Sequence, residues 1–205
     1  MISAREALER LREGNRRFVA GIRAGGIATN RPIELPLDQE PFGIILGCSD
    51  SRVPAEIVFD QGLGDLFVIR VAGNIVASSQ IGSVEFAAEL FGTPLVVVLG
   101  HSRCGAVAAT IEELMLPKEG QSRNLRSIVD RIRPSVEVLL ATELKRDPGA
   151  LMAHAIRTNV RASVNQLRHG SQVLEQLIQR QRLLVVGAEY SLETGVVDFF
   201  EGVPD

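Results

Sequence analysis

The chain has 205 residues, of which 45% are hydrophobic and 23% are charged, and its formal net charge at pH 7 is -3. This composition is that of a globular protein with one sizeable core; the small net charge argues against nucleic-acid binding, and the apolar runs are too short to cross a bilayer. The length predicts a single domain, and the charged, amphipathic start of the chain is no signal peptide, so we predict a cytoplasmic protein. Two cysteines are too few for the disulfide framework of a small secreted domain, so their surroundings must indicate their role.

The first segment of the chain carries a helix signal. Ser3, followed three residues later by Glu6, is a capping-box pattern, and apolar residues then recur at helical spacing up to Phe18. The stretch 21–41 contains glycines and prolines without clear periodicity and predicts a connecting segment. We therefore divide the predicted domain, residues 1–205, into an amphipathic N-terminal helix with its arm (1–41) and a core (42–205).

The core alternates between short apolar runs and helix-like stretches. Runs at 42–46, 66–71, 95–99 and 183–186 have the length and β-branched content of strands, and a last run at 196–200 predicts an edge strand. Helical patterns occupy 54–59, 78–91, 105–116 and a long region from 125 to 180, which Pro134, the turn at 147–149 and Gly170 should interrupt. Buried strands alternating with helices predict an α/β fold, with a mostly parallel sheet flanked by helices.

Two of the predicted strands end in the same way. The first ends in Gly47 and then Cys48, and the third ends in Gly100 and then His101. We expect each glycine to admit a close backbone approach before a candidate ligand. Cys104 lies one turn further on, where a helix N-terminus would favour a thiolate.

If these two strands are neighbours, two sulfurs and one imidazole converge at one edge of the sheet. Three such ligands, Cys48, His101 and Cys104, suit zinc, and a set of three leaves a position open for a water, as in catalytic zinc sites. Two other interpretations remain for the cysteines. They could be small buried hydrophobic residues, or a redox pair, although the Cys-x-x-Cys spacing of such pairs is absent.

The residues around these candidate ligands resemble the signature of the β-class carbonic anhydrases. Cys48-Ser49-Asp50-Ser51-Arg52 and His101-Ser102-Arg103-Cys104 are its two core motifs, and similarities at 14–18, 64–70, 82–86, 159–160 and 187–190 extend the resemblance over nearly the whole chain. The resemblance implies one zinc ion per chain and reversible hydration of CO2 to bicarbonate and a proton, by attack of zinc-bound hydroxide on CO2.

Asp50 and Arg52 receive linked roles in this interpretation. A guanidinium two residues from a carboxylate can clamp it in a bidentate pair and place Asp50 where it accepts a hydrogen bond from the reactive oxygen. If the clamp opens, Asp50 is near enough to become a fourth metal ligand and switch the enzyme off, and the family shows both arrangements. The alternative is a structural salt bridge.

The same resemblance implies a pocket for CO2 lined by Gln39, Phe67 and Phe86. CO2 is small and apolar, so a dry pocket suits it, with the Gln39 amide near an oxygen. For the two phenylalanines, ordinary core packing is the alternative.

Family resemblance also implies a homodimer or a dimer of dimers that shares its sites, so Gln39 or Phe67 would serve the zinc of the neighbouring subunit. Two other functions stay open at this stage. One is hydrolysis of carbonyl sulfide or carbon disulfide on the same fold, and the other is a non-catalytic zinc-binding structural or regulatory role, with Asp50 closing the site.

Overall fold

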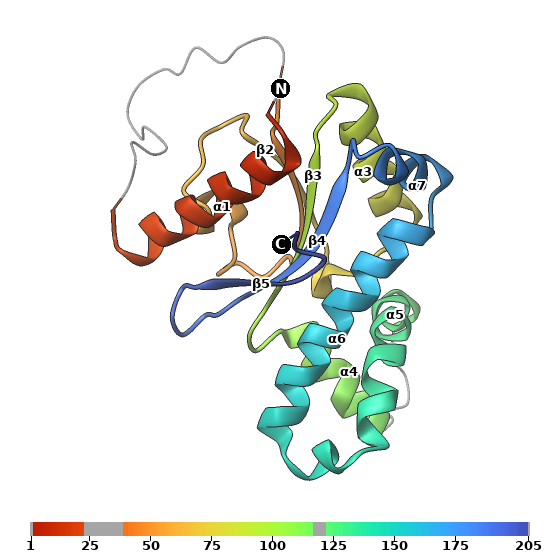
Figure 1. Ribbon diagram of the computed structural model, residues 1–205. Coiled ribbons are helices and arrows are strands. Elements are labelled where there is room, and N and C mark those ends of the chain that lie inside the picture. Colours follow the sequence, from red (N-terminus) through yellow and green to blue (C-terminus); the bar gives the residue numbers. More distant parts are fainter. Residues whose placement is uncertain (1, 23–38, 117–121, 205) are drawn as a thin grey trace.

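The computed structural model describes residues 2–22, 39–116 and 122–204, which form a five-stranded sheet with helices on both faces (Figure 1). The strand order is β2-β1-β3-β4-β5; the first four strands are parallel and β5 is antiparallel to β4. The predicted α/β fold with a C-terminal edge strand is therefore confirmed. The strands are β1 (Gly43–Gly47), β2 (Leu66–Arg70), β3 (Leu95–His101), β4 (Leu184–Tyr190) and β5 (Val197–Glu201).

Helix α1 begins at the predicted capping box, in which the Glu6 N–H donates to Ser3 Oγ (3.2 Å) and the Ser3 N–H donates to Glu6 Oε2 (2.8 Å). Most of the connecting segment predicted at 21–41 lies outside the described residues. None of the helices in the described ranges has the length and apolar character needed to span a membrane. The helical elements are α1 (Ala4–Val19), α2 (Ala55–Val58), the 3₁₀ turn η1 (Ala72–Asn74), α3 (Ser78–Leu90), α4 (Gly105–Met115), α5 (Arg123–Leu140), the 3₁₀ turn η2 (Glu143–Arg146), α6 (Pro148–His169) and α7 (Gln172–Gln179).

Two apolar layers enclose the sheet, one on each face. Helices α1 and α2 pack with alternate strand residues such as Ile45 and Val97, and α3, α6 and α7 pack with the opposite set, such as Ile44 and Val96 (Figure 1). All four of these strand residues have no exposed surface. Strands buried on both faces explain the uninterrupted apolar runs of the sequence.

The helical region after residue 122 differs from the prediction at one position. The breaks near 147–149 and at Gly170 are present, but α5 continues through Pro134. Proline removes one helix hydrogen bond, the one that would end at the carbonyl of Asp130. Because Pro134 and Asp130 are both exposed, water can satisfy that carbonyl, so the predicted interruption at Pro134 is wrong.

The chain order creates a switch point in the middle of the sheet. From β1 the chain moves to β2 on one side and then to β3 on the other side of β1. Ligands of open α/β sheets collect at such a point, beyond the carboxyl ends of the strands. The residues that follow β1 and β3 therefore lie where a functional site is expected.

Candidate metal centre

Cys48, His101 and Cys104 meet at the switch point, and their candidate ligand atoms all lie within 4.8 Å of one another. Gly47 pairs with Leu99, so the ends of β1 and β3 are side by side, as the sequence interpretation required. All three side chains are buried, with His101 at 0% exposure. A third apolar cluster, which includes Val107, surrounds the two sulfurs.

The donor atoms fit a tetrahedral zinc ion. The two Sγ atoms are 4.0 Å apart, too far for a disulfide and close to the roughly 3.8 Å expected between sulfurs on a tetrahedral zinc. An N–H at His101 Nδ1 would donate to the Ser102 carbonyl (2.9 Å), which leaves the lone pair on Nε2. His101 Nε2 is buried and has no hydrogen-bond partner among the described residues, which suits a nitrogen that binds a metal.

The two thiols influence each other's protonation. A hydrogen bond from Cys104 favours the thiolate of Cys48 and lowers the pKa of that thiol, with a further contribution from His101. The same contact, and burial, raise the pKa of Cys104. One sulfur of the pair therefore ionises readily, which favours capture of a cation.

Local backbone geometry places the second and third ligands. His101 ends β3, Arg103 adopts the left-handed conformation with φ 56°, and Cys104 is the N-cap residue of α4. At Gly100 a Cβ atom would lie 2.5 Å from Val160 Cγ2, so this glycine does allow the close approach of α6. At Gly47 the nearest atom to such a Cβ would be 3.9 Å away, so the same expectation for Gly47 is wrong.

Asp50 lies beside the three donors and is clamped by Arg52. Arg52 donates from Nε to Asp50 Oδ1 (2.9 Å) and from Nη2 to Oδ2 (2.8 Å), and its backbone N–H also donates to Oδ1 (3.0 Å). The guanidinium holds the pKa of the Asp50 carboxyl well below its usual range. Asp50 Oδ2 is 3.8 Å from His101 Nε2, so the carboxylate lies between Arg52 and the candidate metal position.

Three hydrogen bonds to the segment from Cys48 to Asp50 were not foreseen from the sequence. Arg70 donates from Nε to the Cys48 carbonyl (3.1 Å) and from Nη2 to the Asp50 carbonyl (2.5 Å), and the Gly73 N–H donates to Cys48 Sγ (3.3 Å). Arg70 follows the buried part of β2 and Gly73 precedes Asn74 in a turn-like pair, which were the available signals. Neither signal indicates which atoms the loop would contact.

The predicted substrate residues lie elsewhere in the chain. Phe67 pairs with Ile44, so it is about four residues, or roughly 13 Å, along the sheet from Cys48. Phe67, Phe86 and Phe91 form an aromatic cluster with ring-centroid distances of 6.2, 6.2 and 5.4 Å, and Phe86 is 51% exposed. Within one chain, these phenylalanines do not line the space around the three donors.

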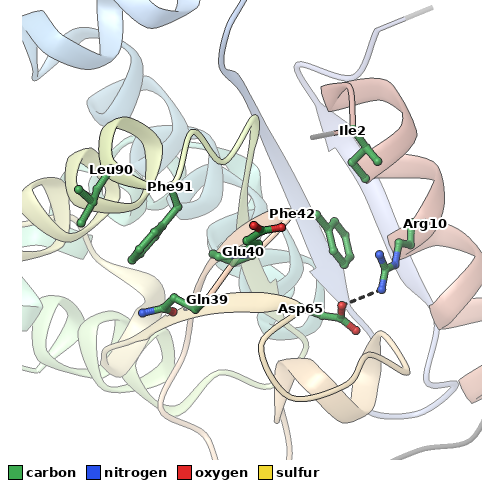
Figure 2. A pocket seen from close by; sticks show the side chains of 9 residues that line it. Ile2, Arg10, Gln39, Glu40, Phe42, Asp65, Leu90 and Phe91 are labelled. Carbon is green, nitrogen blue, oxygen red and sulfur yellow. Dashed lines mark hydrogen bonds and ion pairs between the residues drawn. The ribbon is translucent and has the colours of Figure 1, made fainter. Parts of the chain in front are cut away.

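Gln39 is also at the other edge of the sheet, where a cavity of about 590 Å³ lies at the amino ends of the strands. Gln39 and Phe91 line one end of this cavity, and Arg10 and Asp65 form an ion pair (2.8 Å) at the other (Figure 2). Gln39 is exposed. Since this residue precedes β1 and Cys48 follows it, the length of the strand separates them within one chain.

Comparison with known proteins identifies the family to which this chain belongs. A family model described as carbonic anhydrase matches residues 43–197, which is most of the chain and includes all three candidate ligands. The chain belongs to the β-class carbonic anhydrases. A carbonic anhydrase of Mycolicibacterium smegmatis is 40% identical over 197 residues, with 94% of this chain and 91% of that protein covered.

Solved β-carbonic anhydrases share the fold. The structure of the β-carbonic anhydrase CcaA matches with a TM-score of 0.70 at 25% identity, covering 80% of this chain and 85% of that one. A structure of the tetrameric β-carbonic anhydrases of Sordaria macrospora matches with a TM-score of 0.69 at 24% identity, covering 80% and 82%. The predicted family is confirmed, and the interpretation as a carbonic anhydrase is favoured both over a hydrolase of carbonyl sulfide or carbon disulfide and over a non-catalytic zinc-binding protein.

Proposed function

We propose that this chain hydrates CO2 reversibly to bicarbonate and a proton, using one zinc ion held by Cys48, His101 and Cys104. The observation that carries this proposal is the meeting, within 4.8 Å at the switch point, of two thiols and a buried imidazole nitrogen that has no hydrogen-bond partner in the described part of the chain. Zinc bound there would supply a water acidic enough to become a nucleophile near neutral pH.

Asp50 and Arg52 would orient the nucleophilic water. The clamped carboxylate keeps Asp50 Oδ2 3.8 Å from His101 Nε2, where it can accept a hydrogen bond while it stays out of the ligand set. If the hydrogen bonds from Arg52 broke, the same carboxylate would be free to rotate towards the metal and bind it as a fourth ligand. We therefore propose that the Asp50–Arg52 pair selects between an open and a closed site.

We further propose that the active unit is at least a homodimer, as a pair or as a dimer of dimers. Gln39, Phe67 and Phe86 would then complete the CO2 pocket of the neighbouring subunit. The aromatic cluster supports this assembly through its exposed member, Phe86, as does the description of the Sordaria macrospora β-carbonic anhydrases as tetrameric.

A single domain spanning residues 1–205 is supported by α1, whose buried Leu8 and Leu11 share a core with β1 and β3. The cytoplasmic location stays a prediction.

Replacement of a zinc ligand tests the proposal. Cys48→Ser should lose bound zinc and CO2 hydration, measured by metal analysis and by stopped-flow with a pH indicator, because a serine oxygen is a much weaker zinc ligand than a thiolate. Ser51→Ala, at an exposed position three residues away, is the matched control and should keep both. Equal hydration rates in the two variants would exclude the proposed enzyme. Sulfide release from carbonyl sulfide or carbon disulfide, assayed in parallel, tests the other substrates.

A further inference from the structure

The loop after β2 contacts the metal centre through one backbone amide. The Gly73 N–H donates to Cys48 Sγ at 3.3 Å. Gly73 is buried and left-handed (φ +71°), and a Cβ there would lie 2.7 Å from Ile132 Cδ1 and 3.0 Å from Ala106 Cβ. The Gly73 N–H can point at the sulfur only while the backbone of this loop keeps its left-handed, closely packed conformation.

Two buried polar side chains of α6 hold that loop. Asn159 Nδ2 donates to the Gly73 carbonyl (2.8 Å), and Ser163 Oγ donates to the carbonyl of Asn74 (3.0 Å). Their exposures are 2% and 4%. They are four residues apart and so lie on one face of the helix, on consecutive turns.

The surroundings make these two residues unusual. Along the same helix, Ile156, Val160 and Val164 are buried hydrophobic residues that pack on the sheet or beside the sulfurs. A buried amide or hydroxyl costs free energy unless it is hydrogen-bonded, so apolar residues at 159 and 163 would suit general packing better. The two hydrogen bonds end on adjacent carbonyls of η1, which points to a role for these side chains in that turn.

We propose that Asn159 and Ser163 are positioning residues for the metal centre, because they hold η1 so that the Gly73 N–H faces the Cys48 sulfur. The inference deepens the proposed function and rests on Cys48 being a zinc ligand. A hydrogen bond to a thiolate draws charge away from the sulfur, so less charge reaches the metal and the metal is a stronger Lewis acid.

Loss of this support has two measurable consequences. Cys48 would be less firmly oriented, and zinc affinity should fall on the order of 10-fold, as is common when an outer-shell partner of a ligand is removed. More charge would stay on the sulfur, and the midpoint of the kcat/KM pH profile should move to higher pH. A purely structural role would lower stability without moving that midpoint.

The test uses three variants of the full chain. Asn159→Leu removes the amide at similar size, and Ser163→Ala, the milder change, keeps the test usable if Asn159→Leu does not fold. Val164→Ala is the control, because it trims a neighbouring buried residue of α6 that packs on the sheet. The readouts are zinc affinity, the pH profile, and NMR coupling between an NMR-active cadmium ion in the site and the Gly73 amide proton, which is transmitted through an N–H···S hydrogen bond.

We expect the coupling in the unmodified chain and in Val164→Ala, and its loss or weakening with lower zinc affinity in the other two variants. Absence of the coupling in the unmodified chain, although cadmium is bound, would overturn the inference. So would variants at 159 and 163 whose pH midpoint matches that of Val164→Ala, because a lower zinc affinity or stability without a shift of the midpoint indicates a purely structural role. If the unmodified chain binds no cadmium or zinc, the proposed metal centre itself fails, a result distinct from the others.

Discussion

At the scale of single residues, the proposed chemistry depends on the position of the Asp50 carboxylate between Arg52 and His101. Its carboxylate accepts three hydrogen bonds from Arg52, and it faces His101 Nε2 at 3.8 Å. A bidentate pair fixes both the position and the plane of a carboxylate, which a single contact would not do. The orientation of Asp50 is thus set by Arg52, which is not one of the three candidate ligands.

Arg52→Gln should therefore lower kcat/KM for CO2 hydration on the order of 10- to 100-fold, because Asp50 loses its clamp. Stopped-flow kinetics measure the loss, and X-ray absorption at the zinc edge would report an added oxygen ligand. Arg103→Gln is the matched control, since Arg103 is also near the ligands but pairs with Glu193 (2.7 Å). Equal losses in both variants would mean that general charge, rather than the clamp, is responsible.

Glu189 gives a prediction about stability and pH. Burial raises the pKa of its carboxyl, and Arg157 opposes that change only in part. A raised pKa in the folded state means that the ionised form disfavours folding, so stability is lost as pH rises from about 4.5 through the folded value. Glu189→Gln should gain thermal stability relative to the unmodified chain as pH rises over that range, measured by calorimetry.

Glu193 supplies the control of opposite sign. Hydrogen bonds, first from Ser102, lower the pKa of this exposed carboxyl. Its ionised form therefore favours folding above the ordinary pKa, and that contribution is lost as pH falls through the folded value. Glu193→Gln should lose stability relative to the unmodified chain as pH rises. Parallel pH curves for the two variants would contradict both assignments.

At the scale of elements, the position of α1 depends on two adjacent buried residues, Gly14 and Asn15. Asn15 Nδ2 donates to the carbonyls of Val58 (3.1 Å) and Gly195 (2.9 Å), and the Val197 N–H donates to Asn15 Oδ1 (2.9 Å). One buried side chain thus joins α1 to α2 and to the start of β5. Next to it, a Cβ at Gly14 would lie 1.8 Å from the Phe59 carbonyl oxygen.

Gly14→Ala should destabilise the fold by about 1–3 kcal/mol, because the helix must shift away from rigid backbone. Chemical denaturation measures the change. Gly82→Ala is the matched control: this glycine is exposed within α3, and a Cβ added there would meet no atom of the described residues within 4 Å. It should gain about 0.5–1 kcal/mol from helix propensity. Similar effects at both positions would show that α1 does not dock as described.

At the scale of the whole molecule, the candidate site is divided between the carboxyl ends and the amino ends of the strands of one sheet. The metal ligands follow the carboxyl ends of β1 and β3, while Gln39 and the aromatic cluster lie towards the amino ends. A rigid sheet cannot bring its own two edges together. A second copy can present its amino edge to the metal centre of the first, which is the assembly that we propose.

Phe86→Arg should disrupt this assembly, because it places a charge in the aromatic cluster, and CO2 hydration should fall with it. Analytical ultracentrifugation measures the mass and stopped-flow kinetics measure the rate. Val138→Arg, on the 58% exposed position of α5, is the control and should change neither. A Phe86→Arg monomer with full activity would refute the shared site.

Local structure was predictable from the sequence wherever it depends on residues that are neighbours along the chain. The capping box at Ser3, the breaks around Asp147 and Gly170, and the continuous apolar strands all appear in the structure as predicted. Pro134 was mispredicted because its cost depends on whether the Asp130 carbonyl is exposed, which no local pattern reveals.

The sequence by itself determined the α/β fold class and the three candidate zinc ligands, since strand periodicity and residue type are properties of short segments. Only the tertiary structure decided that β1 and β3 are neighbours, that Gly73 and Arg70 contact the Cys48 segment, and that Gln39 lies at the opposite edge. These facts depend on strand order and on loop direction. They are set by packing between segments far apart in the chain, which no single segment encodes.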